Sequence, residues 1–401
     1  MARKSSADDG LEHRLHRSVS CFAFNGDRTQ IAISPNDSNI LVYEVTPGST
    51  DQWKLLHELK GHDSFVSGID WSATTNLIVS SGHDRNAYVW RFDGGKWSPT
   101  LVILRINRAA NCVQWSPDGN KFAVGSAAKQ VPVCHYEVSN NWWVSKMIKR
   151  HKSSILTLDW HRNNKFLLTG GSDYKTRIFS AFISDIDSTD DEEDFENIFK
   201  DQFKFGAILA EFDCSKGWIE SVRWSPSGFR VAFVGHDSTI TFVQILEGAE
   251  PNVQCLRVKN LPFREVIFLS DDCIVAAGHE CNPYLYVNKG SEATPNWEFR
   301  EKLDKEGAEG AGGAAKKSSK VSAFAASKLL FQSTTSKGTS GSGMGPTVLK
   351  TRHQNQITEC KVLFEDDSES SSSFWSCGTD GRILNWDLKK LGISMDGLNI
   401  S

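Results

Sequence analysis

An all-β repeat fold is the structure that this sequence predicts, and three features of the sequence lead to it. The first is a stretch at 61–92 that alternates apolar and polar residues through Ile69 and Trp71, turns at 72–76, and then runs through two short apolar segments to Trp90. Alternation with a period of two between turn residues is typical of antiparallel strands. The second feature is that similar stretches recur along the chain. One such unit cannot bury both faces of its small sheet, so neighbouring units must cover them. The third is the spacing between them.

The spacing is measured between the aromatic residues that end the first predicted strand of each unit. Consecutive aromatic residues are 47, 44, 45, 64, 44 and 96 residues apart. A period of 44–47 residues is typical of propeller blades with four strands each, and the two longer steps indicate insertions. Seven blades closed into a ring leave no long exposed edge. The aromatic residues are Phe24, Trp71, Trp115, Trp160, Trp224, Phe268 and Phe364.

The sequence therefore predicts one seven-bladed β-propeller over residues 11–390, in which some N-terminal segment completes the last blade. Linkers such as 94–103 and 141–148 contain short apolar runs that suit outer strands, and Ser116-Pro-Asp-Gly119 is a turn signal. The seven units lie at 16–45, 61–92, 105–138, 150–179, 217–245, 263–288 and 353–388.

Two segments do not fit the repeat. The first, at 184–206, is acidic, and its run at 190–194 is expected to be a solvated loop rather than a metal site. The second, at 290–350, lies between the sixth and seventh units and contains Gly-rich tethers. Between the tethers, residues 318–332 favour a short helix, so this long insertion is expected to be helical or disordered.

Apolar residues gather in this short segment more densely than in a typical linker. A disordered loop fits the flanking composition. An arm that folds into a groove of a partner fits the apolar residues equally well, because a short amphipathic helix can bind in that way. The candidate partner-binding residues are Val321, Phe324, Lys328, Leu329, Leu330 and Phe331.

A recurring set of polar residues offers two interpretations. Unit two has a His, a Ser, an Asp and a Trp at fixed offsets, and units four and seven repeat the set. These residues could form a Ser-His-Asp hydrolase triad, but a catalytic site needs one nucleophile rather than three, and no GxSxG elbow occurs. A structural hydrogen-bond ladder within each blade is the favoured interpretation. The residues are His62, Ser80, Asp84 and Trp90; His151, Thr169 and Asp173; and His353, Ser376, Asp380 and Trp386.

Composition excludes several other classes of protein. The net charge of −4 gives no electrostatic signature of nucleic-acid binding. No run of about 18 apolar residues predicts a membrane span, and the first residues lack the apolar core of a signal peptide. Nine scattered Cys without a CxxC pair suggest buried thiols in a reducing cytosol and no zinc site. No phosphate-binding GxxxxGK[ST] motif occurs, so no cofactor and no catalytic residue is expected.

Long stretches of the chain resemble a known family, the WD-repeat propeller subunits of the actin-related-protein 2/3 complex. Generic WD repeats share GH, SPDG and WD dipeptides, but they do not share LVILRINRAA or NNWWVSK. The resemblance covers about residues 11–390. Its most specific stretches are 27–35, 83–90, 99–117, 121–137, 141–146, 235–242 and 353–359.

The resemblance implies a non-catalytic scaffold and regulatory subunit that supports nucleation of branched actin filaments in the cytoplasm. It implies the other complex subunits, the actin filament and nucleation-promoting activators as partners, the last two through the insertion at 290–350. Residues 325–329 depart from the family, whose helix places an aromatic residue beside basic ones. The alternative is a generic WD-repeat adaptor that binds peptides, and such a protein would show an aromatic or charged set at the mouth of its central channel.

Overall fold

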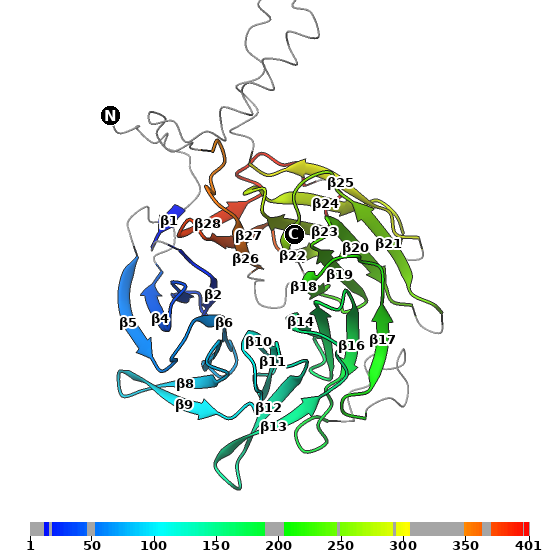
Figure 1. Ribbon diagram of the computed structural model, residues 1–401. Helices are drawn as coiled ribbons and strands as arrows, with labels where there is room; N and C mark the ends of the chain where they lie inside the picture. The colour runs from blue at the N-terminus through cyan, green and yellow to red at the C-terminus, as the bar shows by residue number, and fades with distance from the viewer. Residues whose placement is uncertain are drawn as a thin grey trace, which may run out of the picture.

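Seven four-stranded sheets form a ring in this protein, as Figure 1 shows. The computed structural model describes residues 12–15, 18–45, 53–188, 204–246, 249–291, 294–304, 349–362, 370–395 and 397–400. Within these residues there are 28 strands and no α-helix. The predicted all-β, seven-bladed propeller is therefore confirmed. The described part of the chain also holds no helix with the length and hydropathy needed to cross a bilayer.

Blades 1 to 6 each run from an inner strand to an outer strand in chain order, whereas the outer strand of blade 7 comes from the N-terminus, and all strand pairs are antiparallel. Blade 1 consists of β2 (Cys21–Phe24), β3 (Gln30–Ser34), β4 (Asn39–Glu44) and β5 (Lys54–Lys60). Blade 2 consists of β6 (Val66–Trp71), β7 (Ile78–Gly82), β8 (Ala87–Asp93) and β9 (Lys96–Val102). Blade 3 consists of β10 (Ala110–Trp115), β11 (Lys121–Ser126), β12 (Val131–Glu137) and β13 (Trp142–Ile148). Blade 4 consists of β14 (Ile155–Trp160), β15 (Phe166–Gly171), β16 (Thr176–Ser180) and β17 (Ile208–Phe212), and blade 5 of β18 (Ile219–Trp224), β19 (Arg230–Gly235), β20 (Thr239–Gln244) and β21 (Asn252–Arg257). Blade 6 consists of β22 (Phe263–Ser270), β23 (Cys273–Gly278), β24 (Tyr284–Asn288) and β25 (Trp297–Lys302). Blade 7 consists of β26 (Ile357–Val362), β27 (Ser373–Gly378), β28 (Arg382–Asp387) and β1 (Glu12–Arg14).

The N-terminal strand closes the ring. β1 is the outer strand of blade 7 and pairs with β28, Glu12 opposite Leu384 and Arg14 opposite Arg382. Two further backbone hydrogen bonds extend the junction, one of them from the Val19 amide to the Gly378 carbonyl at 3.2 Å. Without β1, the backbone groups of β28 would form an unpaired edge. The sequence predicted that an N-terminal segment completes the last blade, and the structure identifies this segment as β1.

The aromatic residues used to define the repeat mark the inner strands. Phe24 ends β2 and Trp71 ends β6, and the Trp residues of units three to five likewise end β10, β14 and β18. Phe268 lies within β22, while Phe364 lies outside the described residues. The middle strands lack clear alternation because blades stack on both of their faces, and every residue of β11 is buried. Seven apolar clusters between the sheets form the core.

The turns after the inner strands require a left-handed backbone at one position. Gly119 has φ of +70° and Gly228 has φ of +86° there. In blade 4 the corresponding residue is Asn164, with φ of +62°. Gly and Asn tolerate this conformation better than other residues, which explains the Ser-Pro-Asp-Gly turn signal.

The large insertion begins later than the sequence predicted. β25 lies inside the expected range of 290–350, and it is the outer strand of blade 6. The error arose because an outer strand has one neighbour and an exposed face, so its apolar pattern is weak. Of the six residues of β25 only Trp297 is buried. The segment without described structure starts at 305 and ends at 348.

The C-terminal boundary expected at 390 is also too early. Ile393 and Leu398 are buried and belong to the apolar cluster between blades 6 and 7. The Ser270 hydroxyl donates a hydrogen bond of 2.7 Å to the Leu398 carbonyl. The last residues are therefore part of the propeller's packing, and the C-terminus lies near β22 and β23 in Figure 1.

The acidic insertion begins with a buried ion pair. Residues 189–203 lie outside the described residues, but the side chain of Asp187 before them is almost completely buried. The Lys121 ammonium lies 2.6 Å from its carboxylate and 5.4 Å from the centre of the Trp160 ring, and it donates a hydrogen bond to the Ala181 carbonyl. A charge removed from water needs such partners. The pair fixes the start of the insertion to blade 3.

We expect Lys121→Met to lower the free energy of unfolding by about 3–5 kcal/mol, because it leaves the Asp187 carboxylate buried without its counter-charge. Urea denaturation followed by Trp fluorescence measures the change. The double variant Lys121→Met/Asp187→Leu should recover most of the loss. Lys60→Met removes an exposed ion pair and is the control, with an expected change within about 0.5 kcal/mol. A Lys121→Met variant as stable as this control would contradict the anchoring role.

Candidate functional site: the central channel and the outer surfaces

Side chains of the inner strands line a cavity of about 1240 Å³ along the central opening of the ring. We call the end where the inner strands begin the entry face, and the opposite end the exit face. Phe65 and Trp218 lie at the entry face, just before β6 and β18, whereas Pro117 and Pro226 lie at the exit face, just after β10 and β18. The cavity therefore runs through the depth of the propeller.

Near the entry face, a β-bulge places polar side chains where they reach the next blade. The register between the inner and second strands shifts at this point in blades 2 to 7. The bulged Ser67 and Asn111 each donate a hydrogen bond of 2.7 Å to a backbone carbonyl of the following blade, and Thr358 donates one of 3.0 Å to the Val19 carbonyl. Bulges re-aim side chains in this way. Thr358 joins the last blade to the first.

Carboxylates make a second set of links from blade to blade. Asp70 accepts a hydrogen bond of 2.8 Å from the Trp115 amide, and Asp159 accepts one of 2.7 Å from the Trp224 amide. Glu359 accepts one of 2.8 Å from the Phe22 amide, again between the last and first blades. Charge-assisted bonds to backbone amides are stronger than neutral ones. These acidic residues therefore help to hold the ring together.

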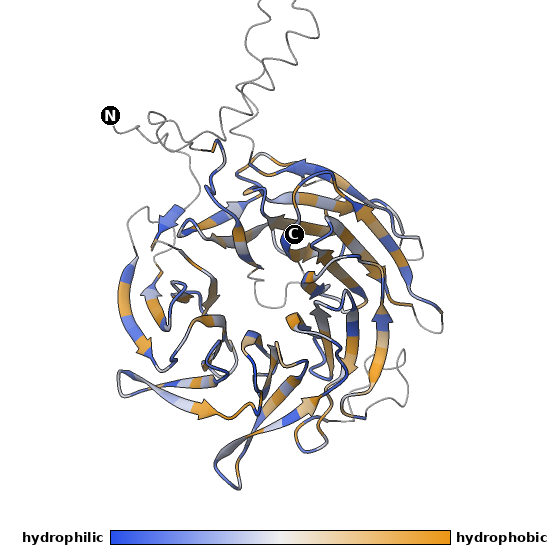
Figure 2. Cartoon of the chain, in the orientation of Figure 1, coloured by the Kyte–Doolittle hydropathy of each residue, from blue (hydrophilic) through white to orange (hydrophobic). Residues whose placement is uncertain are grey.

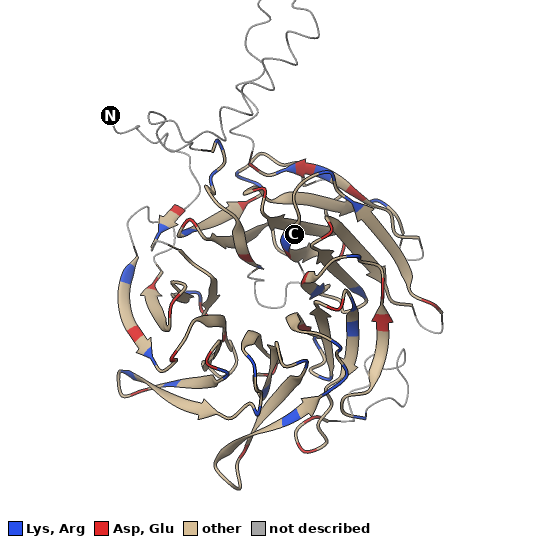
Figure 3. Ribbon diagram, viewed as in Figure 1, with Lys and Arg blue, Asp and Glu red and all other residues tan. Residues whose placement is uncertain are grey.

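Acids outnumber bases on the strand segments that line the cavity. Figure 3 shows charged residues of both signs around the central opening. Burial raises the pKa of Glu265 to about 7, although the nearby Arg223 opposes that rise. Burial also raises the pKa values of Asp159 and Glu359. The five carboxylates are Asp70, Asp159, Glu220, Glu265 and Glu359, and the three bases are Arg223, Arg264 and Lys361.

The recurring His residues lie at the entry face and make hydrogen bonds within their blades. In blade 2, His62 Nδ1 lies 2.9 Å from the Asp84 carboxylate and His62 Nε2 lies 2.8 Å from Ser80 Oγ. The Trp90 indole donates a bond of 2.9 Å to the same Ser80 oxygen. All four side chains are buried or nearly so, which leaves no path for a substrate to the Ser80 hydroxyl.

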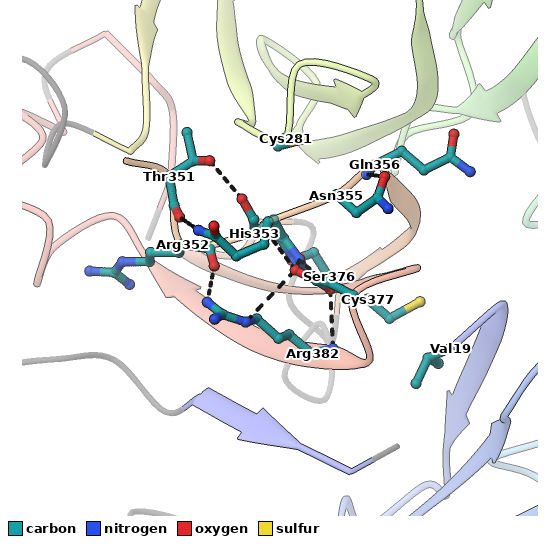
Figure 4. A network of polar contacts seen from close by, with 12 residues as sticks. Val19, Cys281, Thr351, Arg352, His353, Asn355, Gln356, Ser376, Cys377 and Arg382 are labelled. Carbon is teal, nitrogen blue, oxygen red and sulfur yellow. Dashed lines mark hydrogen bonds and ion pairs between the residues drawn. The ribbon is translucent and has the colours of Figure 1, made fainter. Parts of the chain in front are cut away.

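Blade 7 has the same arrangement. Its His353 lies 3.2 Å from Asp380 and 2.8 Å from the Ser376 hydroxyl, and Figure 4 shows His353 beside Ser376. The Trp386 indole donates a bond of 2.8 Å to Ser376. The geometry of these two blades is that of a structural ladder, because each Ser oxygen is held between a ring nitrogen and an indole.

Blade 4 departs from this arrangement. The guanidinium of Arg177 lies between the imidazole and the carboxylate, 3.3 Å from His151 Nδ1 and 2.9 Å from Asp173. His151 Nε2 lies 3.4 Å from the Thr169 hydroxyl. Four residues after the Asp, blade 2 has Tyr88 where blade 4 has Arg177. Burial, together with the Arg177 charge, lowers the pKa of His151 to about 4.

Comparison with known proteins gives a repeat family and close relatives. The WD domain, G-beta repeat family matches residues 53–91 and 142–180. The chain is 40% identical over 380 residues to actin-related protein 2/3 complex subunit 1B of Arabidopsis thaliana, which covers 94% of this chain and 96% of that protein. Subunit 1A-A of Xenopus laevis is 41% identical over 397 residues, 97% of this chain and 99% of that protein. This chain belongs to the actin-related protein 2/3 complex subunit 1 family.

Subunit 1 of Schizosaccharomyces pombe is also related, at 35% identity over 376 residues, 91% of this chain and 96% of that protein. Within this family's fold, the two matched repeats are offset from the blades by one strand. The match at 53–91 begins in β5 of blade 1 and continues through blade 2, and the match at 142–180 begins in β13 of blade 3.

The partner-binding arm expected in this member of the subunit 1 family lies outside the described residues, because Val321, Phe324 and the other residues named for it fall within 305–348. The described surface shows other exposed apolar side chains. Figure 2 shows apolar residues along the outer strands of the ring, and in blades 1 to 3 five apolar side chains on or next to the two outer strands are 45–50% exposed. These are Leu55, Phe92, Leu101, Ile103 and Trp142.

A positive surface on the entry face was missed by sequence reasoning. Six exposed basic residues come from three loops of blades 3 and 4, and these loops are separated in sequence but adjacent in the ring. The net charge of −4 hides such local clustering. Only the order of the loops around the propeller could have revealed it. The residues are Arg105, Arg108, Lys129, Lys149, Arg150 and Lys152.

We expect His151→Gln to make the protein less sensitive to acid. The pKa of His151 lies below that of an unfolded His, so the unfolded chain binds more protons between about pH 6.5 and pH 4, and stability falls as the pH drops. Between pH 7 and pH 5 this difference in pKa lowers the free energy of unfolding of the wild-type protein by about 2 kcal/mol, and the variant should not show that loss. Urea denaturation at both pH values measures this difference. The exposed His83→Gln is the control, and equal acid losses in the two variants would contradict the prediction.

Proposed function

We propose that this chain is the propeller subunit of an actin-related protein 2/3 complex in the cytoplasm, where it supports the nucleation of branched actin filaments. The observation that carries the proposal is the identity of 40% over 94% of the chain to a protein named as subunit 1 of that complex. The similarity extends over all seven blades rather than over the repeat motif alone. The proposed role is non-catalytic, and the recurring Ser and Asp residues stabilise blades.

The outer edge of blades 1 to 3 is the surface that we propose for packing against other subunits. Apolar side chains that stay exposed on outer strands can be covered only by another chain or segment. Leu101 and Ile103 are 46% and 48% exposed at one end of β9, and Trp142 is 50% exposed at the start of β13. Stable subunit interfaces use such aromatic and aliphatic residues at their centres.

A tagged full-length chain purified from cytosol should bring down the two actin-related proteins and the smaller subunits at equal ratio. The variant Leu101→Asp/Ile103→Asp should lose most of this co-purification, because two charges then face an apolar partner surface. Leu261→Asp changes a residue that is 55% exposed on the entry face of blade 6 and is the matched control. A wild-type chain that purifies alone, or with ubiquitin-ligase subunits, would contradict complex membership itself.

The segment at 318–332 is the arm that we propose for contact with activators or the mother filament. Its support is the position between blades 6 and 7, together with the apolar residues Phe324, Leu329 and Phe331. Replacing all three with Ser should leave the complex assembled, because the described residues alone complete all seven four-stranded sheets. The change should lower the rate of branch formation several-fold in a pyrene-actin polymerisation assay.

The control for the arm is Ser333→Ala/Ser336→Ala, which changes the same insertion without removing apolar side chains. The assembled complex is purified for each variant, so the assay compares activity at equal subunit content. Unchanged branch formation in the triple variant would reject the arm and leave the proposed membership of the complex standing.

A further inference from the structure

Charge is distributed unevenly between the two faces of the propeller. The loops of the entry face are those that precede an inner strand and those that join the second and third strands of a blade. Among their described residues, ten basic side chains are exposed against three acidic ones, Asp37, Asp63 and Asp213. The entry face therefore carries a marked positive charge. The basic residues are Arg85, Arg105, Arg108, Lys129, Lys149, Arg150, Lys152, Lys216, Lys259 and Lys350.

The exit face is almost balanced by the same measure. The described residues of its loops and of the segment after β28 expose four acidic and five basic side chains. The acidic run at 190–194 falls between β16 and β17, which are joined at this face. The propeller is thus electrically polar along its axis. The exit-face residues are Asp27, Asp118, Asp185 and Glu250, and Arg162, Lys204, Lys289, Lys389 and Lys390.

Neighbouring acids do not neutralise the basic side chains of the entry face. None of the ten makes an ion pair with a residue in the described part of the chain. At the exit face, by contrast, the Lys289 ammonium lies 2.7 Å from the Glu298 carboxylate, and that of Lys390 lies 3.7 Å from Asp387. The fold does not use the positive charges of the entry face, so they are available to attract an anionic partner.

Large apolar side chains are also exposed in the loops of the entry face. Phe65 is 50% exposed, Trp218 is 51% exposed and Leu261 is 55% exposed. In the described loops of the exit face, Val138 is the one large apolar side chain with such exposure. Exposed apolar groups within a polar surface mark a site of interaction. Besides Ile103 at the outer edge, the entry-face residues are Phe65, Tyr174, Trp218, Leu261 and Leu349, and each belongs to a loop of a different blade.

This arrangement suits a broad anionic surface better than an acidic peptide. The basic residues come from loops of blades 2 to 7, and the apolar residues lie among the same loops rather than along one groove. At the centre of the face opens the channel, whose wall holds more carboxylates than bases, so it would repel an acidic segment that entered it. Trp and Tyr favour the headgroup level of a bilayer, where Lys and Arg meet anionic lipids.

We propose that the entry face binds reversibly to the surface of a lipid bilayer that contains anionic phospholipids. The basic loops lie against the headgroups, while Phe65, Trp218 and Leu261 insert among them. The nearly balanced exit face then points away from the bilayer. The surface belongs to the single chain, so this inference does not depend on membership of the complex.

The test is co-sedimentation of the full-length chain with phosphatidylcholine vesicles, with or without phosphatidylserine as about a third of the lipid. We expect about tenfold stronger binding to the mixed vesicles, falling several-fold between about 0.1 M and about 0.5 M salt, because salt screens the attraction. Lys149→Glu/Lys152→Glu should weaken binding about tenfold, since two attractive charges become repulsive. Lys389→Glu/Lys390→Glu makes the same change at the exit face and should bind like wild type.

The apolar contribution is tested at constant charge. Trp218→Ser/Leu261→Ser should weaken binding to the mixed vesicles several-fold, whereas Val138→Ser at the exit face should not. Lipids with brominated acyl chains quench the fluorescence of a Trp that reaches into the bilayer. They should therefore quench the wild-type chain more than Trp218→Phe, which keeps an apolar ring at the same position.

Equal binding to vesicles with and without phosphatidylserine would overturn the proposal, as would a Lys149→Glu/Lys152→Glu variant that binds like wild type. A soluble poly-Glu peptide bound as tightly as the mixed vesicles would also overturn it, because the face would then recognise acidic protein. The thermal unfolding midpoint shows whether each variant folds. If one does not, the dependence of the wild-type chain on phosphatidylserine and salt decides the question. A negative result would leave the proposed role in the complex standing.

Discussion

Closure of the ring is the constraint on which the rest of this structure depends. No blade can bury both faces alone, so each one relies on two neighbours, and that is possible for all seven only if the last meets the first. The chain secures this junction in three ways: β1 pairs with β28, Thr358 bonds to the Val19 carbonyl, and Glu359 bonds to the Phe22 amide. The same kinds of side-chain link recur between other blades.

Because polar groups hold the blades together around the opening, the interior of the channel cannot be apolar. Asp70 and Asp159 are needed as acceptors for backbone amides that would otherwise be buried without partners. The charge of the channel follows from this structural requirement, and Glu265, paired with Arg223, is a further carboxylate on its wall. The ladders of His62 and His353 serve a different purpose, since they fix the loops of single blades on the entry face.

Much of the fold could be predicted from the sequence because buried inner strands leave a regular signal. Trp71, Trp115 and Trp160 recur at a blade's length, and each ends an inner strand. Outer strands give no such signal: β25 buries one residue and was taken for part of an insertion, and the three residues of β1 carry no apolar pattern at all. An outer strand has water on one side and a single neighbouring strand on the other, so few of its residues need to be apolar.

The candidate site was harder to predict, for a related reason. Ladder residues repeat at fixed offsets within one blade, so they could be found by counting, although nothing in the spacing showed that Arg177 would come between His151 and Asp173. The basic surface around Lys129 and the acidic channel around Glu265 each combine residues from several blades. Such groups depend on the order of blades around the ring, which no local pattern records.

The position of β1 also determines when the molecule can be completed during its synthesis. Of the described strands, β1 is synthesised first and its partner β28 last. Until then the growing chain has an open ring with two unsatisfied edges, and unpaired strand edges of this kind favour aggregation. A chain that stops short of Arg382 therefore loses more than one strand, because it leaves the first strand without a partner and the ring open.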